Sequence, residues 1–427
     1  MTFLIGSMIL FLIIGIPIAF ALGFSSLLYV VFFLDVSPMV VVQQVSSGAD
    51  SMVLLALPFF MLAGEIMNAS GITQRLTRAV LAVIGPPRGG LSYVVIFVNV
   101  LMAMVSGAAI ASAAAVGTTM VPVMEKKGYS RDYAAALNAA AATMGGVIPP
   151  SVGFILYASV SGASVGKLFL AGTIPGLLIA VGACILCAIQ AQRHRFPAGE
   201  KRSFKEIRDS LVEAGPALLM PVIILGGIFG GLVTPTEAGA LAAAYGLVAG
   251  LVIYRTLRLS DLPGILLVTA RRTVSIMFII ACASCFGFLI SREINADEFT
   301  GLFQAVTQNR HVLMLLLTIL IILLGTVLEG SSIMIILTPL LLPILKAYQI
   351  DPVHFGVVFL VGLMIGLLTP PVGILLFVMA GISNSPVQSI IKHLRPFYIM
   401  FAILLLLLMY IPELSLWLVE KAGGGLK

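Results

Sequence analysis

Apolar residues run almost without interruption along this chain, and paired prolines break two of the longest runs. The pairs Pro149-Pro150 and Pro370-Pro371 each lie among glycines in an otherwise apolar stretch. A proline inside a helix removes a backbone donor and clashes with the preceding turn, so two in succession predict an unwound segment. Unwound backbone at membrane depth is tolerated only where it is buried in protein or lines a cavity. Two broken helices at corresponding positions of two halves are typical of the binding site of a transporter.

Two other apolar runs have small and polar residues at their centres. The centre of residues 91–124 reads Ser106-Gly107-Ala108-Ala109, and that of residues 312–345 reads Leu328-Glu329-Gly330-Ser331-Ser332. Long apolar runs with flexible middles predict two re-entrant helical hairpins, each of which enters and leaves by the same face of the membrane. For residues 91–124, two ordinary spans or one helix with a small-residue packing face are the alternatives.

Other segments predict simpler elements. Residues 2–34 predict one long tilted helix or two short spans, because a run of this length exceeds a ~30 Å membrane core at ~1.5 Å per residue. We read this run as retained membrane helix, followed by a linker up to about Gly48. Residues 71–81 space their apolar side chains as in an amphipathic helix that lies along the membrane interface. The last span is expected to end near Trp417.

The plan of elements occurs twice. Pro122 and Pro149 are 27 residues apart, and Pro343 and Pro370 are also 27 residues apart. If each half contains five full spans plus a hairpin, the odd number inverts the second half relative to the first, which is the architecture expected for alternating access. The expected units are a first repeat over 1–192 with its broken helix at 131–170, a linker over 193–212, and a second repeat over 213–420 with its broken helix at 353–390.

Composition places the whole chain in a membrane. Hydrophobic residues make up 60% of the 427 residues and charged residues only 10%, against about 25% charged in a typical soluble domain. The mean hydropathy of +1.14 points to an all-α integral membrane protein. The most basic stretch contains Arg193, Arg195, Lys201, Arg202, Lys205 and Arg208. The positive-inside rule places this linker in the cytoplasm, together with Lys126 and Lys127.

Short motifs along nearly the whole chain resemble one family. They are residues 57–65 (LPFFMLAGE), Ser106-Gly107, Gly128-Tyr129, residues 148–151 (IPPS), 168–172 (LFLAG), 175–177 (PGL), 234–238 (TPTEA) and 369–373 (TPPVG). In this order they resemble the large membrane (M) subunit of tripartite ATP-independent periplasmic (TRAP) transporters. The resemblance implies an elevator-type carrier driven by sodium ions, in the bacterial cytoplasmic (inner) membrane as a multi-pass protein. It also implies a small membrane (Q) subunit and a soluble periplasmic substrate-binding (P) protein as partners.

The resemblance implies that the two hairpin tips and the two breaks hold the ions and the substrate. Sodium needs oxygen ligands, which freed backbone carbonyls supply at a broken helix. An acid within a membrane span, such as Glu329, is also a functional hypothesis by default. The candidate sodium ligands are Ser106, Gly107, Ser112, Thr143, Gly146, Pro149, Glu329, Gly330, Ser332, Gly366 and Thr369. The alternative for any single Ser or Thr is a hydrogen bond to a carbonyl one turn back.

Helices that restart after the proline pairs direct positive dipole ends at an anion. The candidate substrate contacts are Ala108, Pro150, Ser151, Ser331, Pro371 and Val372. The family often has Ser-Gly-Ser-Ser at the first tip, so the alanines at 108 and 109 remove two hydroxyls that the family pattern supplies. Family members carry C4-dicarboxylates, sialic acid and related sugar or keto acids, and nothing in the sequence selects among these small organic anions. Few cations lie near the predicted site, so recognition is expected to rely on helix dipoles and bound sodium.

Other functions find less support. Two C-x-x-C pairs, at Cys184 and Cys282, lie within apolar spans without a nearby histidine, so we read them as packing residues and expect no metal other than sodium and no cofactor. No phosphate-binding Gly-rich motif is present, and nothing indicates nucleic acid as a partner. An enzyme within the bilayer would need a catalytic pair, but only isolated acids such as Glu65, Glu237 and Glu329 are found. The nearest rival is a stand-alone sodium/dicarboxylate symporter of the divalent-anion type, and a scaffold subunit would not need two helix breaks.

Overall fold

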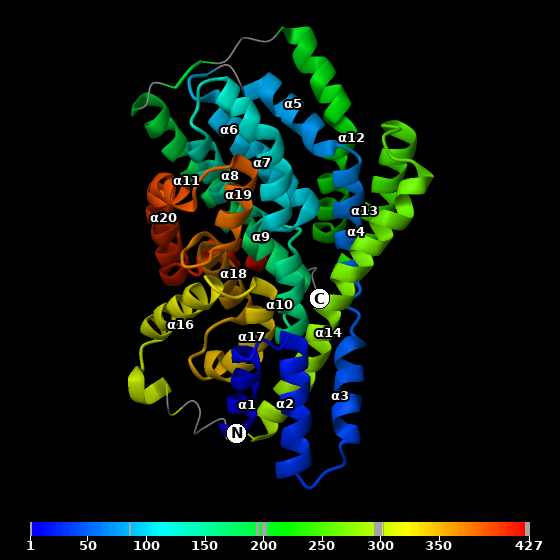
Figure 1. Ribbon diagram of the computed structural model, residues 1–427, viewed down its shortest axis with the longest axis vertical. Coiled ribbons are helices and arrows are strands. Elements are labelled where there is room, and N and C mark those ends of the chain that lie inside the picture. Colours follow the sequence, from blue (N-terminus) through cyan, green and yellow to red (C-terminus); the bar gives the residue numbers. More distant parts are fainter. Residues whose placement is uncertain are drawn as a thin grey trace.

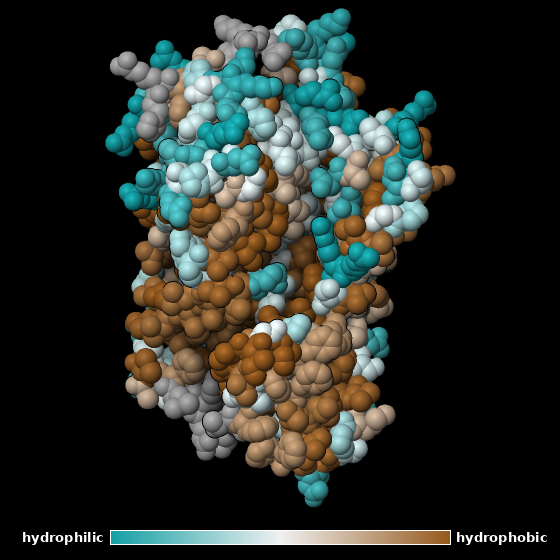
Figure 2. Space-filling view, in the orientation of Figure 1, coloured by the Kyte–Doolittle hydropathy of each residue, from teal (hydrophilic) through white to brown (hydrophobic). Residues whose placement is uncertain are grey.

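The computed structural model describes residues 2–84, 87–193, 196–198, 203–293, 301 and 303–422. In this part of the chain, helices make up nearly all of the structure (Figure 1). Among the described residues, six helices are long and apolar enough to cross a membrane, or seven if the bent pair Arg131–Val147 and Val152–Ser161 is one span. The six are Val165–Arg193, Phe204–Phe229, Pro235–Ile253, Leu259–Ile290, Gly330–Ala347 and Val387–Tyr410. Hydrophobic residues cover the middle and lower parts of the face in Figure 2, and hydrophilic residues gather at the end that carries α5. The protein is therefore a multi-pass, all-helical membrane protein.

The first apolar run forms two short helices. Helices α1 (Thr2–Ile13) and α2 (Ile18–Phe33) pack against each other. The chain turns between them at Gly15, whose φ is +90°, and at Pro17, which precedes α2. Of the two alternatives for residues 2–34, the structure therefore has the pair of short segments.

The prediction of a linker up to about Gly48 was wrong, because most of this segment forms helix α3 (Met39–Ala49). This helix packs along the long helix α14 (Leu262–Glu293). The two backbones approach so closely that a Cβ on Gly48 would lie 2.4 Å from the Cβ of Ser284. Tertiary packing against α14 thus stabilises a helix that the local sequence signals only weakly.

A second group of helices packs beside α14. It comprises α4 (Ala56–Ala69), α5 (Ile72–Ile84), α12 (Phe204–Phe229) and α13 (Pro235–Val248). Helix α5 buries Ile72, Leu76 and Val80 and leaves Arg78 exposed. The amphipathic helix predicted at residues 71–81 is therefore present as α5, and its position along the membrane interface stays a prediction.

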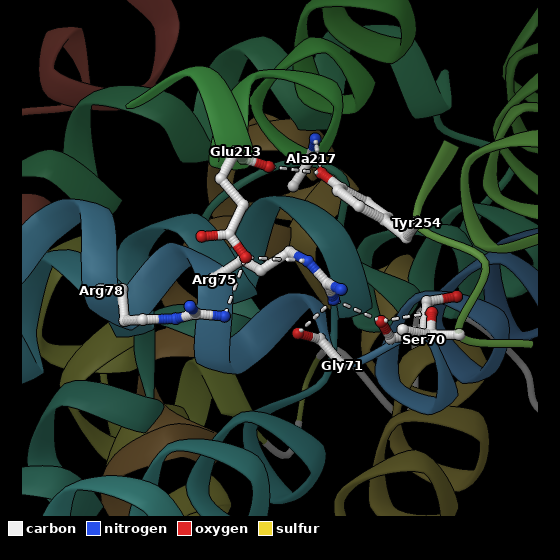
Figure 3. Close-up of polar contacts among 8 residues, drawn as sticks. Ser70, Gly71, Arg75, Arg78, Glu213, Ala217 and Tyr254 are labelled. Carbon is white, nitrogen blue, oxygen red and sulfur yellow. Dashed lines mark hydrogen bonds and ion pairs between the residues drawn. The ribbon is translucent and has the colours of Figure 1, made fainter. Parts of the chain in front are cut away.

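Arg75 ties α5 to three other parts of this group (Figure 3). Its Nη1 donates hydrogen bonds to two carbonyl oxygens at the end of α4, at 2.8 and 3.1 Å. Its Nε lies 3.6 Å from Oε1 of Glu213 on α12. The guanidinium also lies 4.1 Å above the ring of Tyr254, which follows the π-helix η1 (Ala249–Ile253), and burial raises the pKa of this tyrosine.

The first half contains a helical pair and a broken helix. The elements are α6 (Gly90–Ser106), α7 (Ala109–Lys126), α8 (Arg131–Ala142), α9 (Met144–Val147) and α10 (Val152–Ser161). Gly107 and Ala108 form the tip between α6 and α7. The chain bends by 41° at the break between α9 and α10. Helix α11 (Val165–Arg193) begins inside the stretch 131–170 expected for the broken helix, because Gly162 ends α10 in a left-handed conformation with φ of +73°.

The second half also has a helical pair and a broken helix, followed by one long helix. The elements are α16 (Arg310–Gly325), α17 (Gly330–Ala347), α18 (Pro352–Leu368), α19 (Ile374–Ser383) and α20 (Val387–Tyr410). The last span ends at Tyr410, so the prediction that it ends near Trp417 was wrong. Pro412 follows the span, and Trp417 lies in the separate helix α21 (Glu413–Ala422), which packs on α11.

The two helical pairs open toward opposite ends of the molecule (Figure 1). Helices α6 and α7 open toward the end that holds α5, the end of α11 and the start of α12. Helices α16 and α17 open toward the end that holds α1 to α3. The basic residues Arg193, Lys205 and Arg208 belong to the ends of α11 and α12, whereas Arg195, Lys201 and Arg202 of the predicted linker lie outside the described residues.

Candidate functional site

Each helical pair contacts the broken helix of its own half through one backbone hydrogen bond. The N–H of Val152 donates to the carbonyl oxygen of Gly107 at the first tip, 3.1 Å away. The N–H of Gly373 donates to the carbonyl oxygen of Thr326 beside the second tip, 3.0 Å away. Val152 and Gly373 each lie two residues after the second proline of their pair. The two halves therefore join tip and break in the same way.

Glycine is required where these backbones meet. Gly107 has a left-handed φ of +60°, and a Cβ there would lie 2.7 Å from the carbonyl oxygen of Pro150. In the second half, a Cβ on Gly366 would lie 2.8 Å from the Cα of Gly325. Only a residue without a Cβ permits such close backbone approach. The glycines of the two tips and breaks thus bring polar backbone groups together at one place.

The broken helices restart directly after the proline pairs, whose Pro-Pro peptide bonds are both cis. Ser151 is the N-cap of α10, and its Oγ accepts a hydrogen bond from the N–H of Phe154 at 3.4 Å. The same hydroxyl donates to the carbonyl oxygen of Gly146 at 2.6 Å. Helix α19 begins after Gly373, whose φ is +61°. The first turns of α10 and α19 carry the positive ends of the helix dipoles.

A cavity of about 490 Å³ lies between the two tips and helices α4 and α14. Its volume is within the range of about 300–1,000 Å³ that is usual for small-molecule sites. Seven residues predicted as ion or substrate contacts line it: Ser106, Gly107, Ala108, Gly146, Glu329, Gly330 and Ser331. Most of the remaining wall is apolar, with Met61, Met102, Ile276, Met334 and Leu360 among its side chains. The structure thus brings the two tips and one break together around a single space.

Two predicted serines lie directly behind the cavity wall. The Oγ of Ser112 is 3.1 Å from the Oγ of Ser106, and Ser112 is fully buried. Ser332 donates its backbone N–H to Oε2 of Glu329, 3.2 Å away. Both serines therefore support a tip residue that faces the cavity.

The remaining predicted residues are not part of the described cavity wall. Thr143 and Thr369 donate their hydroxyls to carbonyl oxygens of their own helices, each at 2.7 Å. This is the hydrogen bond to the preceding turn that was the alternative for such residues. The residues of the breaks that are not part of the described cavity wall are Pro149, Pro150, Ser151, Gly366, Pro371 and Val372.

Glu329 has a structural role that the sequence did not reveal. It is the N-cap of α17, and its Oε2 accepts hydrogen bonds from the hydroxyls of Ser331 and Ser332 as well as from the Ser332 N–H. A carboxylate at this position also interacts favourably with the dipole of the helix. The side chain is nevertheless exposed to the cavity, so capping and ion binding are both compatible with its position.

Sequence reasoning missed the wall of the cavity that faces the tips. Arg272 on α14 and Glu65 on α4 both line the cavity, and Nη1 of Arg272 donates to Oε2 of Glu65 at 3.0 Å. Arg272 is the one cation among the described residues that line this space. The sequence did contain a signal for Arg272, because an ionisable residue within an apolar span marks a functional site by default. Only the fold shows that Arg272 and Glu329 line the same cavity.

The described residues contain no cluster of three or more His, Cys, Asp or Glu side chains that would hold a metal ion. The four cysteines are free thiols, with Cys184 and Cys187 on α11 and Cys282 and Cys285 on α14. The oxygen donors at the tips are hydroxyls, backbone carbonyls and one carboxylate. This donor set fits a hard cation such as sodium and does not suit zinc or copper.

Comparisons with known proteins identify the family of the chain. The sequence profile described as "Tripartite ATP-independent periplasmic transporter, DctM component" matches residues 5–414. The sialic acid TRAP transporter large permease protein SiaM of Vibrio cholerae is 36% identical over 410 residues, which are 96% of each chain. The C4-dicarboxylate TRAP transporter large permease protein DctM of Pseudomonas aeruginosa is also 36% identical, over 403 residues and 94% of each chain.

A solved structure shares the fold. The YdaH transporter of Alcanivorax borkumensis superposes with a TM-score of 0.61 over 86% of each chain, at 18% sequence identity. The profile covers nearly the whole chain, and the relatives match it almost from end to end, so the match identifies the family of the whole chain. The chain belongs to the large membrane subunits of tripartite ATP-independent periplasmic transporters.

Proposed function

We propose that this protein takes up a small organic anion by sodium-coupled secondary transport across the bacterial cytoplasmic membrane. The substrate is a C4-dicarboxylate, sialic acid or a related sugar or keto acid. A periplasmic binding protein delivers it, and a small membrane subunit completes the transporter, as the word tripartite in the family description implies. The relatives named for sialic acid and for C4-dicarboxylates support this class of substrate.

One observation carries the proposal. The bond from Val152 to Gly107 recurs as the bond from Gly373 to Thr326, each between a helix pair and a broken helix. Together with the opposite openings of the two pairs in Figure 1, this favours two re-entrant hairpins in an inverted repeat. In an elevator mechanism, the hairpins and broken helices move as one body against α4, α14 and their neighbours. The cavity between these two groups is then the place where substrate is exposed.

Sodium is proposed to bind where the tips meet the breaks. A first ion is assigned to the oxygens around Ser106, Ser112 and the carbonyls of the first break. A second ion is assigned to the oxygens around Glu329, Ser332 and the carbonyls of the second break. The short Ser106–Ser112 distance of 3.1 Å and the exposed carboxylate of Glu329 support these positions. The bound ions supply positive charge, and the dipole ends of α10 and α19 add to it at the anion.

Reconstitution in proteoliposomes tests this proposal. The chain is reconstituted with its small subunit in proteoliposomes. A binding protein and a labelled acid are added outside the vesicles, and an inward sodium gradient is applied. We expect uptake that requires both the gradient and the binding protein. Uptake without a sodium gradient would refute the coupling. Uptake by the chain alone would favour the stand-alone symporter.

A further inference from the structure

The cavity contains an ion pair that the two-tip site does not use. Arg272 lies in the apolar helix α14 and Glu65 in α4, and their side chains meet at 3.0 Å. Both face the same space as Glu329. Charged side chains within membrane spans are costly and usually paired, and they mark substrate or ion pathways. The pair is therefore the first place to look for a group that recognises charge on the substrate.

The hydrogen bonding of Arg272 is incomplete. A guanidinium has five N–H donors, and among the described residues one of these, on Nη1, bonds to Glu65. The side chain of Arg272 is 59% exposed, whereas that of Glu65 is 26% exposed. The free N–H groups are thus accessible from the cavity. A planar guanidinium suits an oxyanion, because two parallel N–H groups can bind both oxygens of a carboxylate.

The charge balance of the cavity decides how an anion can bind there. Glu65 neutralises Arg272, and Glu329 contributes a further negative charge to the same cavity. The sodium ions assigned to the two tips offset this charge and that of an added carboxylate. Glu65 occupies the Nη1 donor of Arg272, so a carboxylate that binds the guanidinium through two parallel N–H groups competes with Glu65 for it.

We propose that Arg272 binds a carboxylate of the substrate and that Glu65 is the counter-ion which this carboxylate displaces. The proposal rests on the proposed function and names a specificity determinant within the same cavity. Arg272 lies on the wall that faces the tips, so it holds the anion only while the cavity has this arrangement. Glu65 competes with the substrate for Arg272 and thereby weakens binding, which favours release.

Substitutions of Arg272 and of Glu65 should have opposite effects on the affinity for the acid. Affinity is measured as the half-saturating concentration for thermal stabilisation of the purified transporter in detergent with sodium, using succinate, pyruvate, gluconate and N-acetylneuraminate as probes. Arg272→Gln should raise this concentration for the most effective acid by about 10- to 100-fold, as expected for a lost hydrogen bond to a charged group. Glu65→Gln should lower it several-fold, because the competitor is gone.

The variant with both substitutions, Arg272→Gln and Glu65→Gln, gives a specific order of affinities. In Arg272→Gln alone, Glu65 remains as an unpaired negative charge that repels the acid. Adding Glu65→Gln should therefore recover part of the loss, so that affinity decreases in the order Glu65→Gln, wild type, double variant, Arg272→Gln. The matched control is Arg271→Gln, because Arg271 is the exposed neighbour on α14 and is not part of the described cavity wall. This control should bind like the wild type.

Other outcomes would overturn the inference. An ion pair that only joins α4 to α14 predicts that both single variants lose thermal stability and that neither gains affinity. If an acid stabilises the wild type and Arg272→Gln at the same concentration, Arg272 is not the receptor although the proposed function stands. If none of the four acids stabilises the wild type, the proposed substrate class fails and this inference fails with it.

Discussion

The backbone N–H of Val152 and the carbonyl oxygen of Gly107 lie 3.1 Å apart, and this bond fastens the first hairpin tip to the restart of its broken helix. Its counterpart in the second half joins Gly373 to Thr326. In the proposed elevator mechanism, these two bonds hold the two tips and the two breaks together as one moving body. Helices α4 and α14 then provide the opposing wall of the cavity.

Gly107→Ala should destabilise the protein and weaken its sodium response. A left-handed φ costs a non-glycine residue about 1–2 kcal/mol, and the added Cβ would lie 2.7 Å from the Pro150 carbonyl oxygen. The melting temperature in detergent and the sodium dependence of uptake measure the two effects. Gly162→Ala is the control, because φ there is +73° but nothing lies within 4 Å of the added Cβ. If both variants respond to sodium alike, the contact between tip and break does not contribute to coupling.

Glu329→Gln should keep the fold and weaken sodium coupling. The amide oxygen of Gln can still accept the hydrogen bond from Ser332, so the cap of α17 is preserved. The negative charge at the second tip is lost. We expect a higher sodium concentration for half-maximal uptake and little change in melting temperature. An unchanged sodium response would assign Glu329 to capping alone.

Arg75→Gln should lower the stability of the group formed by α4, α5, α12 and α13. The largely buried guanidinium bonds two carbonyl oxygens and lies over Tyr254 (Figure 3), so its loss should cost about 1–3 kcal/mol. Arg78→Gln is the control, since Arg78 is 59% exposed and pairs with the same Glu213. A surface ion pair of this kind contributes about 0–1 kcal/mol. Equal shifts in melting temperature would contradict the special role of Arg75.

The inverted repeat predicts where two lysines lie. Lys127 follows the first helical pair and Lys346 lies near the end of the second, and both are exposed. Cysteines are placed at these positions in a background without native cysteines. In intact cells, a membrane-impermeant thiol reagent should label position 346 only, because the proposed inverted repeat opens the first helical pair to the cytoplasm and the second to the periplasm. Equal labelling of the two positions would refute the inversion.

Local signals in the sequence located the breaks and tips well. Paired prolines and the small residues at Ser106-Gly107 and Glu329-Gly330 act through backbone chemistry that is independent of distant contacts. Helix α3 was missed because it depends on packing against α14 at Gly48. Arg272 was missed for a similar reason, since its meaning arises from its position opposite the tips and beside Glu65. Such relations across the fold do not appear in local periodicity.

Sodium-driven uptake by a variant without the second proline pair tests the central claim most directly. Pro370 and Pro371 are exposed, unlike the buried first pair, so Pro370→Ala/Pro371→Ala disturbs the core least. Proline disfavours a helix interior by about 3 kcal/mol, so alanines should favour a continuous helix. We predict a folded transporter whose initial rate of labelled-acid uptake under an inward sodium gradient falls to background. Uptake at the wild-type rate would contradict the claim that the breaks form the binding site.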